Sequence, residues 1–377
     1  MRCLMNIGLL AHRDTACRAP TLVRAKHLSP IPLILLLALV TGSCGAQQET
    51  HQSIVQSPSA PRLAASVLDV TPPSARVEGS PGNMRIIERS CHAAAPADIR
   101  RRIVNTAVQE WAFFGFQVDA QSVDPDPAGN AGTAANMPRR FLPLLPEEVA
   151  QVATTVGGYW AAIPGSDWIL KRQNDAWQQD AGLSSRWRDP WSAAFISWVM
   201  CESGLSDSQQ FQRAIAHHTY IDQAIRAQDS NDTVAAYLAY SPGAAEISPG
   251  DLLCNGLRPM YRTLDERRKQ LGEGARTHCD IVVRVNTDAG QILTIGGNVR
   301  ASVRMKMYPA GIAPGGMHVA PLPTRRPVFA HLKLQTPAVE ADAVLNTPTL
   351  QQLGCTLPSP PVTFAQVNLT VPFITPC

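Results

Sequence analysis

The chain has 377 residues, of which 45% are hydrophobic and 17% charged, so it is long enough to bury a core as one large domain or two small ones. Its net charge of +3 is too small to indicate a nucleic-acid partner, because the arginines are scattered and no basic run alternates with aromatic residues. The 31 prolines are concentrated in residues 57–82 and 309–376, which predicts extended segments on either side of a compact middle.

The first 44 residues are typical of an export signal. Basic residues between positions 18 and 26 precede the apolar run 31–40, which is too short for a comfortable transmembrane span, and small residues then lead to Cys44. The ending VTGSC resembles a bacterial lipoprotein signal, in which Cys44 would be lipidated, although Thr41 stands where an aliphatic residue is usual. Lipidation, simple secretion and an uncleaved anchor are the alternatives. We expect an exported, periplasmic protein that contacts the membrane through a lipid anchor.

Export would place the cysteines in an oxidising compartment, which favours disulfides. After positions 3, 17 and 44, six cysteines lie at positions 91, 201, 254, 279, 355 and 377. We expect Cys355 and Cys377 to close the Pro-rich end of the chain. No CxxC, HExxH or regular Cys/His spacing is present in the sequence, so neither a metal site nor a cofactor is expected.

The compact middle is predicted to run from residue 91 to residue 324, after a tether of residues 45–90 and before a Pro-rich tail of residues 325–377. Apolar residues at helical spacing predict helices over 97–114, 147–163 and 211–228, and a short helix is expected over 232–240. Strands are expected at 251–255, 278–285 and 291–295, the last two joined by a hairpin loop. Helices followed by an antiparallel sheet define an α+β domain.

One further helix is predicted within RWRDPWSAAFISWVMCESG, residues 186–204. Asp189 is a suitable N-cap and Pro190 suits the first helical position, so the helix should run to about Cys201. Ser192 then lies in the first turn, where unpaired backbone N–H groups and the helix dipole would stabilise a developing anion. The simplest interpretation is nevertheless that Ser192 is one of the many small polar residues found in first helical turns.

Four motifs, in this order along the chain, carry a resemblance to a known family: PWSAAFISWV (190–199), SPGDLL (248–253), HCDIVVRV (278–285) and LTIGGNV (293–299). They resemble the motifs of CHAP-type amidases and peptidases, which are relatives of the NlpC-type cell-wall hydrolases. Over residues 97–323 the chain also resembles the bacterial domain-of-unknown-function 2272 family. The first resemblance implies a papain-like α+β fold and peptidoglycan, or another cell-wall peptide, as the partner.

The resemblance also implies roles for three residues. Ser192 takes the position of the nucleophile, His278 that of the base, and Asn298 that of the residue that orients the imidazole by accepting its N–H. The chain departs from the family at the nucleophile, where serine stands in place of cysteine. A hydroxyl is harder to ionise than a thiol, so it needs a base that takes its proton during attack and a firm oxyanion hole.

Trp191, His217 and Asp280 are candidates for substrate binding. Neighbouring residues of a helix point about 100° apart, so at most one of His217 and His218 would face a site. Asp280 would bind a substrate amine or simply be solvated, and Trp191 is favoured as a packing residue over a sugar platform. Cys279 follows His278 in a strand, so its side chain should point to the opposite face and be buried or disulfide-bonded.

Two functions from different classes are consistent with these residues. In the first, the protein is an exported amidase or peptidase in which Ser192 attacks a carbonyl, His278 accepts the proton and first-turn N–H groups bind the oxyanion. In the second, it is a catalytically inactive papain-like module that binds peptidoglycan or an envelope partner. A structural envelope lipoprotein with neither property is a third possibility.

Overall fold

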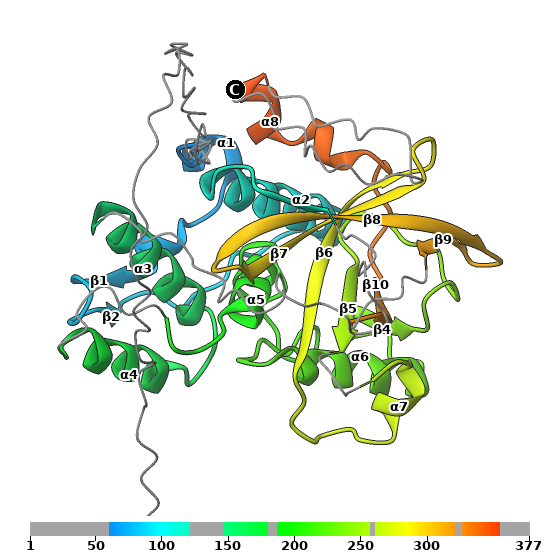
Figure 1. The fold of residues 1–377 in the computed structure, drawn as a ribbon, viewed down its shortest axis with the longest axis horizontal. Coiled ribbons are helices and arrows are strands. Elements are labelled where there is room, and N and C mark those ends of the chain that lie inside the picture. The colour runs from blue at the N-terminus through cyan, green and yellow to red at the C-terminus, as the bar shows by residue number, and fades with distance from the viewer. Residues whose placement is uncertain (1–59, 121–145, 180–186, 257–260, 321–325, 355–377) are drawn as a thin grey trace, which may run out of the picture. The chain divides into compact units, whose positions relative to one another are not determined.

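The computed structural model describes residues 60–120, 146–179, 187–256, 261–320 and 326–354 (Figure 1). These residues form a mixed α+β fold in which helices pack on an eight-stranded sheet, which confirms the predicted α+β class. The strand order is β3-β8-β7-β6-β5-β10-β4, with β9 paired to β8. β3 runs parallel to β8, and the other neighbouring pairs of this sheet are antiparallel.

The strands of this sheet are β3 (Val118–Ala120), β4 (Tyr237–Tyr240), β5 (Leu252–Gly256), β6 (Thr277–Asn286), β7 (Gln291–Val299), β8 (Ser302–Ala313), β9 (Gly316–Val319) and β10 (Val328–Leu334). β1 (Val77–Glu78) and β2 (Arg85–Ile86) form a separate two-stranded sheet. The helices are α1 (Ala65–Leu68), η1 (Pro73–Arg76), α2 (Pro96–Phe113), α3 (Pro146–Ala161), α4 (Asp167–Trp177), α5 (Ser192–Glu202), α6 (His217–Ser230), α7 (Leu264–Arg268), η3 (Ala343–Asn346) and α8 (Pro348–Leu353).

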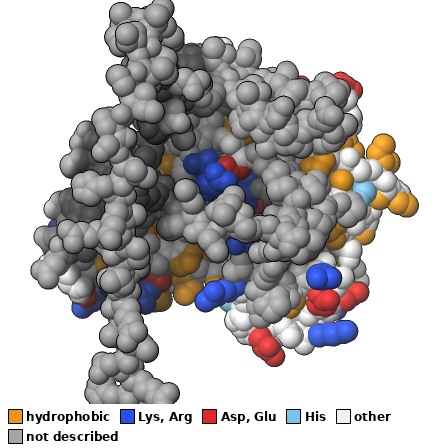
Figure 2. All heavy atoms as spheres, viewed as in Figure 1, with side chains coloured by type: hydrophobic (Ala, Val, Ile, Leu, Met, Phe, Trp, Pro, Cys, Tyr) orange, Lys and Arg blue, Asp and Glu red, His pale blue; other side chains and the backbone are white. Residues whose placement is uncertain are grey.

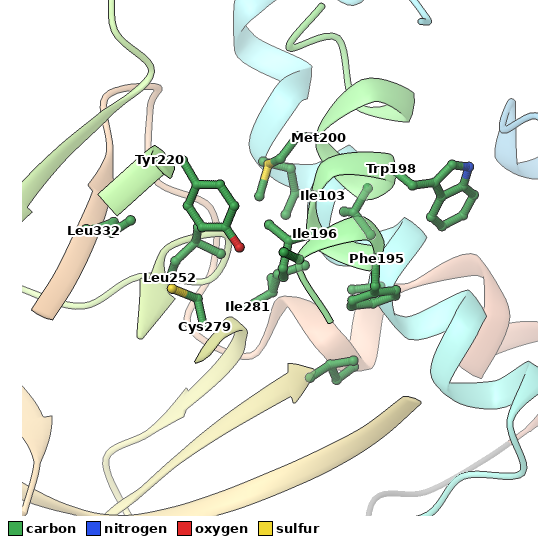
Figure 3. Close-up of a cluster of buried hydrophobic side chains, with 14 of the residues drawn as sticks. Ile103, Phe195, Ile196, Trp198, Met200, Tyr220, Leu252, Cys279, Ile281 and Leu332 are labelled. Carbon is green, nitrogen blue, oxygen red and sulfur yellow. The ribbon is translucent and has the colours of Figure 1, made fainter. Parts of the chain in front are cut away.

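Helix α5 lies at the centre of the fold. All of its residues are buried, because it contacts β6 and β7 of the sheet as well as α2 and α3. Figure 3 shows the packing on two sides of this helix, with Trp198 on the side opposite to Tyr220 and Cys279. A helix that is apolar around its whole circumference requires such surroundings. The helix that the sequence singled out is therefore the core element of the domain.

The two faces of the central strands pack into different apolar clusters. Cys279, Ile281 and Val283 of β6 belong to the large cluster that contains α5. Val282, between them, faces a smaller cluster formed with Ile292 and other residues of the sheet. Because side chains alternate along a strand, residues 278, 280 and 282 share the face of the smaller cluster. The side chains of His278 and Asp280 therefore extend from the face of β6 that is opposite to the α5 cluster.

The folded part begins earlier than the sequence analysis expected. Residues 60–90, which were assigned to a tether, are joined to α2 and α5 by buried ion pairs and pack against α3 through an apolar cluster that includes Val77 and Met84. Arg62 Nε lies 2.6 Å from Glu110 Oε1, and Arg76 pairs with the fully buried Glu202 at the end of α5. These contacts extend the folded domain to residue 60 at its N-terminal side.

The C-terminal part of the sheet also differs from the expectation. Residues 232–240 were predicted as a short helix, but residues 237–240 form β4, which pairs with β10. β10 lies in the predicted tail, yet it is inserted between β4 and β5. The sequence analysis did not identify β8 or β9.

Strands β8 and β9 pair as a hairpin, and Ile312 of β8 is 89% exposed. In Figure 2, hydrophobic side chains gather on the side where β9 lies in Figure 1.

Asp251, which precedes β5, holds a buried junction of three elements. Its carboxylate accepts hydrogen bonds from Arg100 Nη1 of α2 at 2.7 Å, from His331 Nε2 of β10 at 2.9 Å and from the backbone N–H of Leu334 at 3.0 Å. Burial alone would raise the pKa of Asp251, but His331 and Arg100 lower that pKa below its ordinary value. The Asp of the SPGDLL motif therefore joins α2 to both strands, and Arg100 is its partner.

Two disulfides join distant parts of the described chain. Cys91 is bonded to Cys201 in α5, and Cys254 of β5 is bonded to Cys279 of the adjacent strand β6. The expectation that Cys279 is buried or disulfide-bonded is confirmed on both points.

Among the described helices, none combines the length and apolar character that a membrane span requires.

Candidate functional site

Ser192 is the first residue of α5. The helix starts two residues later than the predicted first position, Pro190, and Asp189 pairs with Arg172 of α4 instead of capping it. The first helical hydrogen bond of α5 joins Phe195 N–H to Trp191 O at 3.0 Å. The backbone N–H groups of residues 192–194 precede this bond, so they are the donors available to an anion at the helix N-terminus.

His217 is the first residue of α6 and contacts Ser192 directly. Its Nε2 lies 2.7 Å from Ser192 Oγ, and both side chains are buried. The sequence predicted a helix from residue 211, which would have placed His217 in a second turn. Because α6 starts at His217 instead, the N-termini of the two helices converge at this pair.

The contacts of His217 Nδ1 determine which ring nitrogen carries the proton. The backbone N–H of Cys279 donates to Nδ1 at 3.2 Å, and the Tyr220 hydroxyl contacts the same nitrogen. A backbone N–H only donates, so Nδ1 acts as an acceptor and the proton of the neutral imidazole is on Nε2. His217 Nε2–H therefore donates to Ser192 Oγ, and the serine proton is left for another acceptor.

His217 is held in its neutral form. Burial lowers the pKa of His217 well below its ordinary value, and the nearby His278 and Lys306 lower it further. The position at the N-terminus of α6 acts in the same direction, because the positive end of the helix dipole disfavours an imidazolium. His217 is thus a neutral hydrogen-bond donor at neutral pH.

A second histidine, His278, lies beside this pair on β6. The centroids of the His217 and His278 rings are 5.1 Å apart. His278 Nε2 lies 2.8 Å from Asp280 Oδ1, and Asp280 also accepts two hydrogen bonds from Lys306 Nζ, at 2.9 and 2.7 Å. Asp280 is fully buried, whereas the His278 side chain is 24% exposed. The ring is therefore open to solvent on one side and anchored on the other.

The partners of His278 define its tautomer as clearly as those of His217. A carboxylate only accepts, so the proton of the neutral ring is on Nε2 and the lone pair is on Nδ1. Burial opposes ionisation of Asp280, but Lys306 and His278 hold the pKa of Asp280 far below its ordinary value. Burial and the charge of Lys306 lower the pKa of His278. At neutral pH the site holds a carboxylate and a neutral imidazole with a free lone pair.

The structure gives the predicted catalytic residues partly different partners. Ser192 has its hydrogen bond with His217, not with His278, and Asp280 holds His278 in the way that was expected of Asn298. Asn298 has a positive φ of 56° at the irregular end of β7, where the register with β8 shifts. In the described chain, the side-chain hydrogen bond of His278 is the one to Asp280.

The predicted substrate-binding residues also have specific positions. Trp191 is buried and stacks on Phe114 at a centroid distance of 6.0 Å, so it is a packing residue in this structure. His217 is beside Ser192, and Asp280 is buried in an ion pair. Cys44, Cys355 and Cys377 lie outside the described residues. Within the described ranges, no group of three or more His, Cys, Asp or Glu side chains is arranged to hold a metal ion.

The fold and the site together define a class: an α+β protein with a serine at the start of a buried helix, one histidine at the start of α6 and a second histidine on the central strand β6. Residues 148–334 match the model of a family described as an uncharacterized protein conserved in bacteria (DUF2272). This segment contains every residue of the site, and the match confirms the resemblance to that family that the motifs indicated. No curated protein and no solved structure matches the chain.

Proposed function

We propose that this protein is an exported hydrolase of amide bonds in cell-wall peptides, built on a papain-like domain, with Ser192 as its nucleophile. The observation that carries the proposal is a pair of histidines with complementary tautomers, of which His217 is hydrogen-bonded to Ser192 and His278 adjoins His217. His217 donates to Ser192 Oγ, while His278 Nδ1 has a lone pair available for the serine proton. The proposed substrate class and the proposed papain-like fold are supported by the order of the four sequence motifs, not by the geometry of the histidines.

In the proposed reaction, Ser192 Oγ attacks the carbonyl carbon of the substrate and passes its proton to His278. Asp280 keeps the His278 ring in place and stabilises the imidazolium that forms. First-turn N–H groups of α5 would bind the oxyanion, and His217 Nε2–H would steady the attacking oxygen. The tetrahedral intermediate then collapses as the C–N bond breaks and His278 gives its proton to the leaving amine, which leaves an acyl-enzyme. Water attacks this ester while His278 takes a proton from it, and His278 returns that proton to Ser192 Oγ as the carboxylic acid product leaves.

The test is digestion of purified peptidoglycan by residues 45–377, with soluble fragments identified by mass spectrometry. We expect His278→Ala to lower kcat by about 10²–10⁴, the range of general-base catalysis, and Ser192→Ala to abolish release. Asp280→Ala should lose activity, whereas Asn298→Gly, which keeps the positive φ, should retain it. Turnover that survives His278→Ala in a folded protein would refute the proposed base.

A second candidate is a papain-like module that binds a cell-wall peptide without cleaving it. One observation favours it: the hydrogen-bond partner of Ser192 is His217, which already carries its proton on the facing nitrogen and cannot accept another. This candidate predicts that Ser192→Ala still binds peptidoglycan in a pull-down and that neither protein releases fragments. Release by Ser192→Cys alone would also support it, because a thiolate needs less help from a base.

The location outside the cytoplasm belongs to the same proposal. Two disulfides within one domain are typical of proteins that fold in oxidising compartments. Together with the export signal, they support a periplasmic protein held at the membrane by lipidated Cys44. Metabolic labelling with a palmitate analogue, in the native protein and in Cys44→Ala, tests the anchor.

A further inference from the structure

Lys306 on β8 is a buried cation beside the site that the proposed reaction does not use directly. Only 7% of the residue is exposed, and its ammonium group makes hydrogen bonds to both oxygens of Asp280. Burying an ion pair carries a desolvation cost for each ion that offsets much of their attraction, so such a pair is weak evidence for stability. Its place next to His278 suggests a different role.

Lys306 reaches Asp280 because the sheet aligns them. On β8, Val303 and Met305 face the cluster around α5, so residues 304, 306 and 308 face the other side. Asp280 shares that side on β6, and Gly296 of the intervening strand β7 has no side chain to separate them: a Cβ at Gly296 would collide with the Asp280 carboxylate. The ion pair therefore spans β7 through the space that this glycine leaves.

We propose that Lys306 is a positioning residue: it keeps Asp280 ionised as the acceptor of His278 Nε2–H, and its positive charge disfavours a second proton on the ring, so His278 Nδ1 stays unprotonated as a proton acceptor. This inference rests on the proposed function, in which His278 is the base. Without Lys306, the pair formed by Asp280 and His278 would bind one proton in addition to the ring proton on Nε2. It would keep that additional proton up to a higher pH. The proton acceptor would then be lost under neutral conditions.

In the described part of the chain, the other charged and titratable groups near His278 lie on α6, on β8, where Tyr308 also contacts Asp280, and before β10. His217 lies on α6 and is neutral, and Arg326, which precedes β10, lowers the pKa of His278 less than Lys306 does. Arg304 lies two residues from Lys306 on the same face of β8, but it pairs with Asp119 at 3.2 Å. Arg304 is therefore a matched control, because it is a partly buried cation on the same strand as Lys306 and is paired with a carboxylate of its own on β3.

The experiment is an NMR titration of the His278 ring in the full chain labelled at histidine, with His278→Gln identifying the signal. In Lys306→Met we expect the midpoint to move to higher pH by about one pH unit or more, as removal of a cation within a few ångströms requires. Lys306→Arg should restore the native midpoint, and Arg304→Met should leave it in place. An unmoved midpoint in Lys306→Met, or an equal shift in Arg304→Met, would overturn the proposal.

A second comparison covers the case in which Lys306→Met does not fold because it leaves a lone buried carboxylate. Asp280→Asn keeps an acceptor for His278 Nε2–H, and the double variant Asp280→Asn/Lys306→Met removes both charges together. The midpoint of the double variant should lie above that of Asp280→Asn, and equal midpoints would refute the role of Lys306. Absence of turnover in the native protein would refute the hydrolase instead, since the titration needs no substrate.

Discussion

The disulfide Cys91–Cys201 should contribute more to stability than Cys254–Cys279, and the difference follows from the length of chain that each one closes. The first closes a loop of 110 residues and the second a loop of 25. In the chain-entropy model these lengths correspond to about 4.8 and about 3.5 kcal/mol near 25 °C, a difference of about 1.3 kcal/mol. Both bonds lie in the same domain, and three of their four cysteines are buried while Cys91 is partly buried, so loop length is the main variable between them.

The assay is urea unfolding of the two double-serine variants, followed by tryptophan fluorescence, after mass spectrometry of peptic peptides has verified both bonds in the native protein. We expect Cys91→Ser/Cys201→Ser to lose the larger free energy of unfolding. Two results would refute the reasoning: a loss below about 1 kcal/mol for that variant, or a larger loss for Cys254→Ser/Cys279→Ser. The latter would mean that local packing beside β5 and β6 outweighs chain entropy.

Three further predictions concern stability and are checked by the same unfolding assay. Arg100→Met should cost about 3–5 kcal/mol because it leaves Asp251 buried without its cation, whereas Arg101→Met, which breaks an exposed pair, should cost about 1 kcal/mol or less. Asp251 has a lowered pKa, so its contribution should be complete above its ordinary value of 3.8 and decline as pH falls towards the folded value; Asp251→Asn should weaken this acid dependence. Gly297→Ala should cost about 1–3 kcal/mol, because its Cβ would lie 2.5 Å from the Cβ of a buried phenylalanine of α5, while Gly274→Ala, with open space around it, should cost less than about 0.5 kcal/mol.

The sequence predicted the three elements that the core requires. α5, β6 and β7 lie within a few residues of their expected positions. β10 was missed because it follows a Pro-rich stretch that reads as a tail. The N-terminal segment was missed for another reason: Arg62 and Arg76 attach it to the domain by pairing with buried carboxylates, and ion pairs leave no periodic signal in a sequence.

Only some of the contacts in the candidate site could be predicted from the sequence. His278 and Asp280 are two residues apart in a strand, so their shared face could have been inferred from the alternation that correctly separated Cys279 from His278. The contact between Ser192 and His217 could not be inferred, because it depends on where α6 begins and on how two helices meet. The buried position of Lys306 likewise depends on strand β8, which the sequence did not identify.

The GGN segment has a different role from the one its resemblance implied. A side chain at Gly296 would collide with the carboxylate that holds His278, and one at Gly297 would collide with α5, the helix that carries Ser192. The two glycines face opposite sides of β7, one towards the His278–Asp280 pair and the other towards Phe195 of α5. The absence of side chains at Gly296 and Gly297 therefore lets the Asp280 carboxylate and helix α5 approach β7 closely from its two faces.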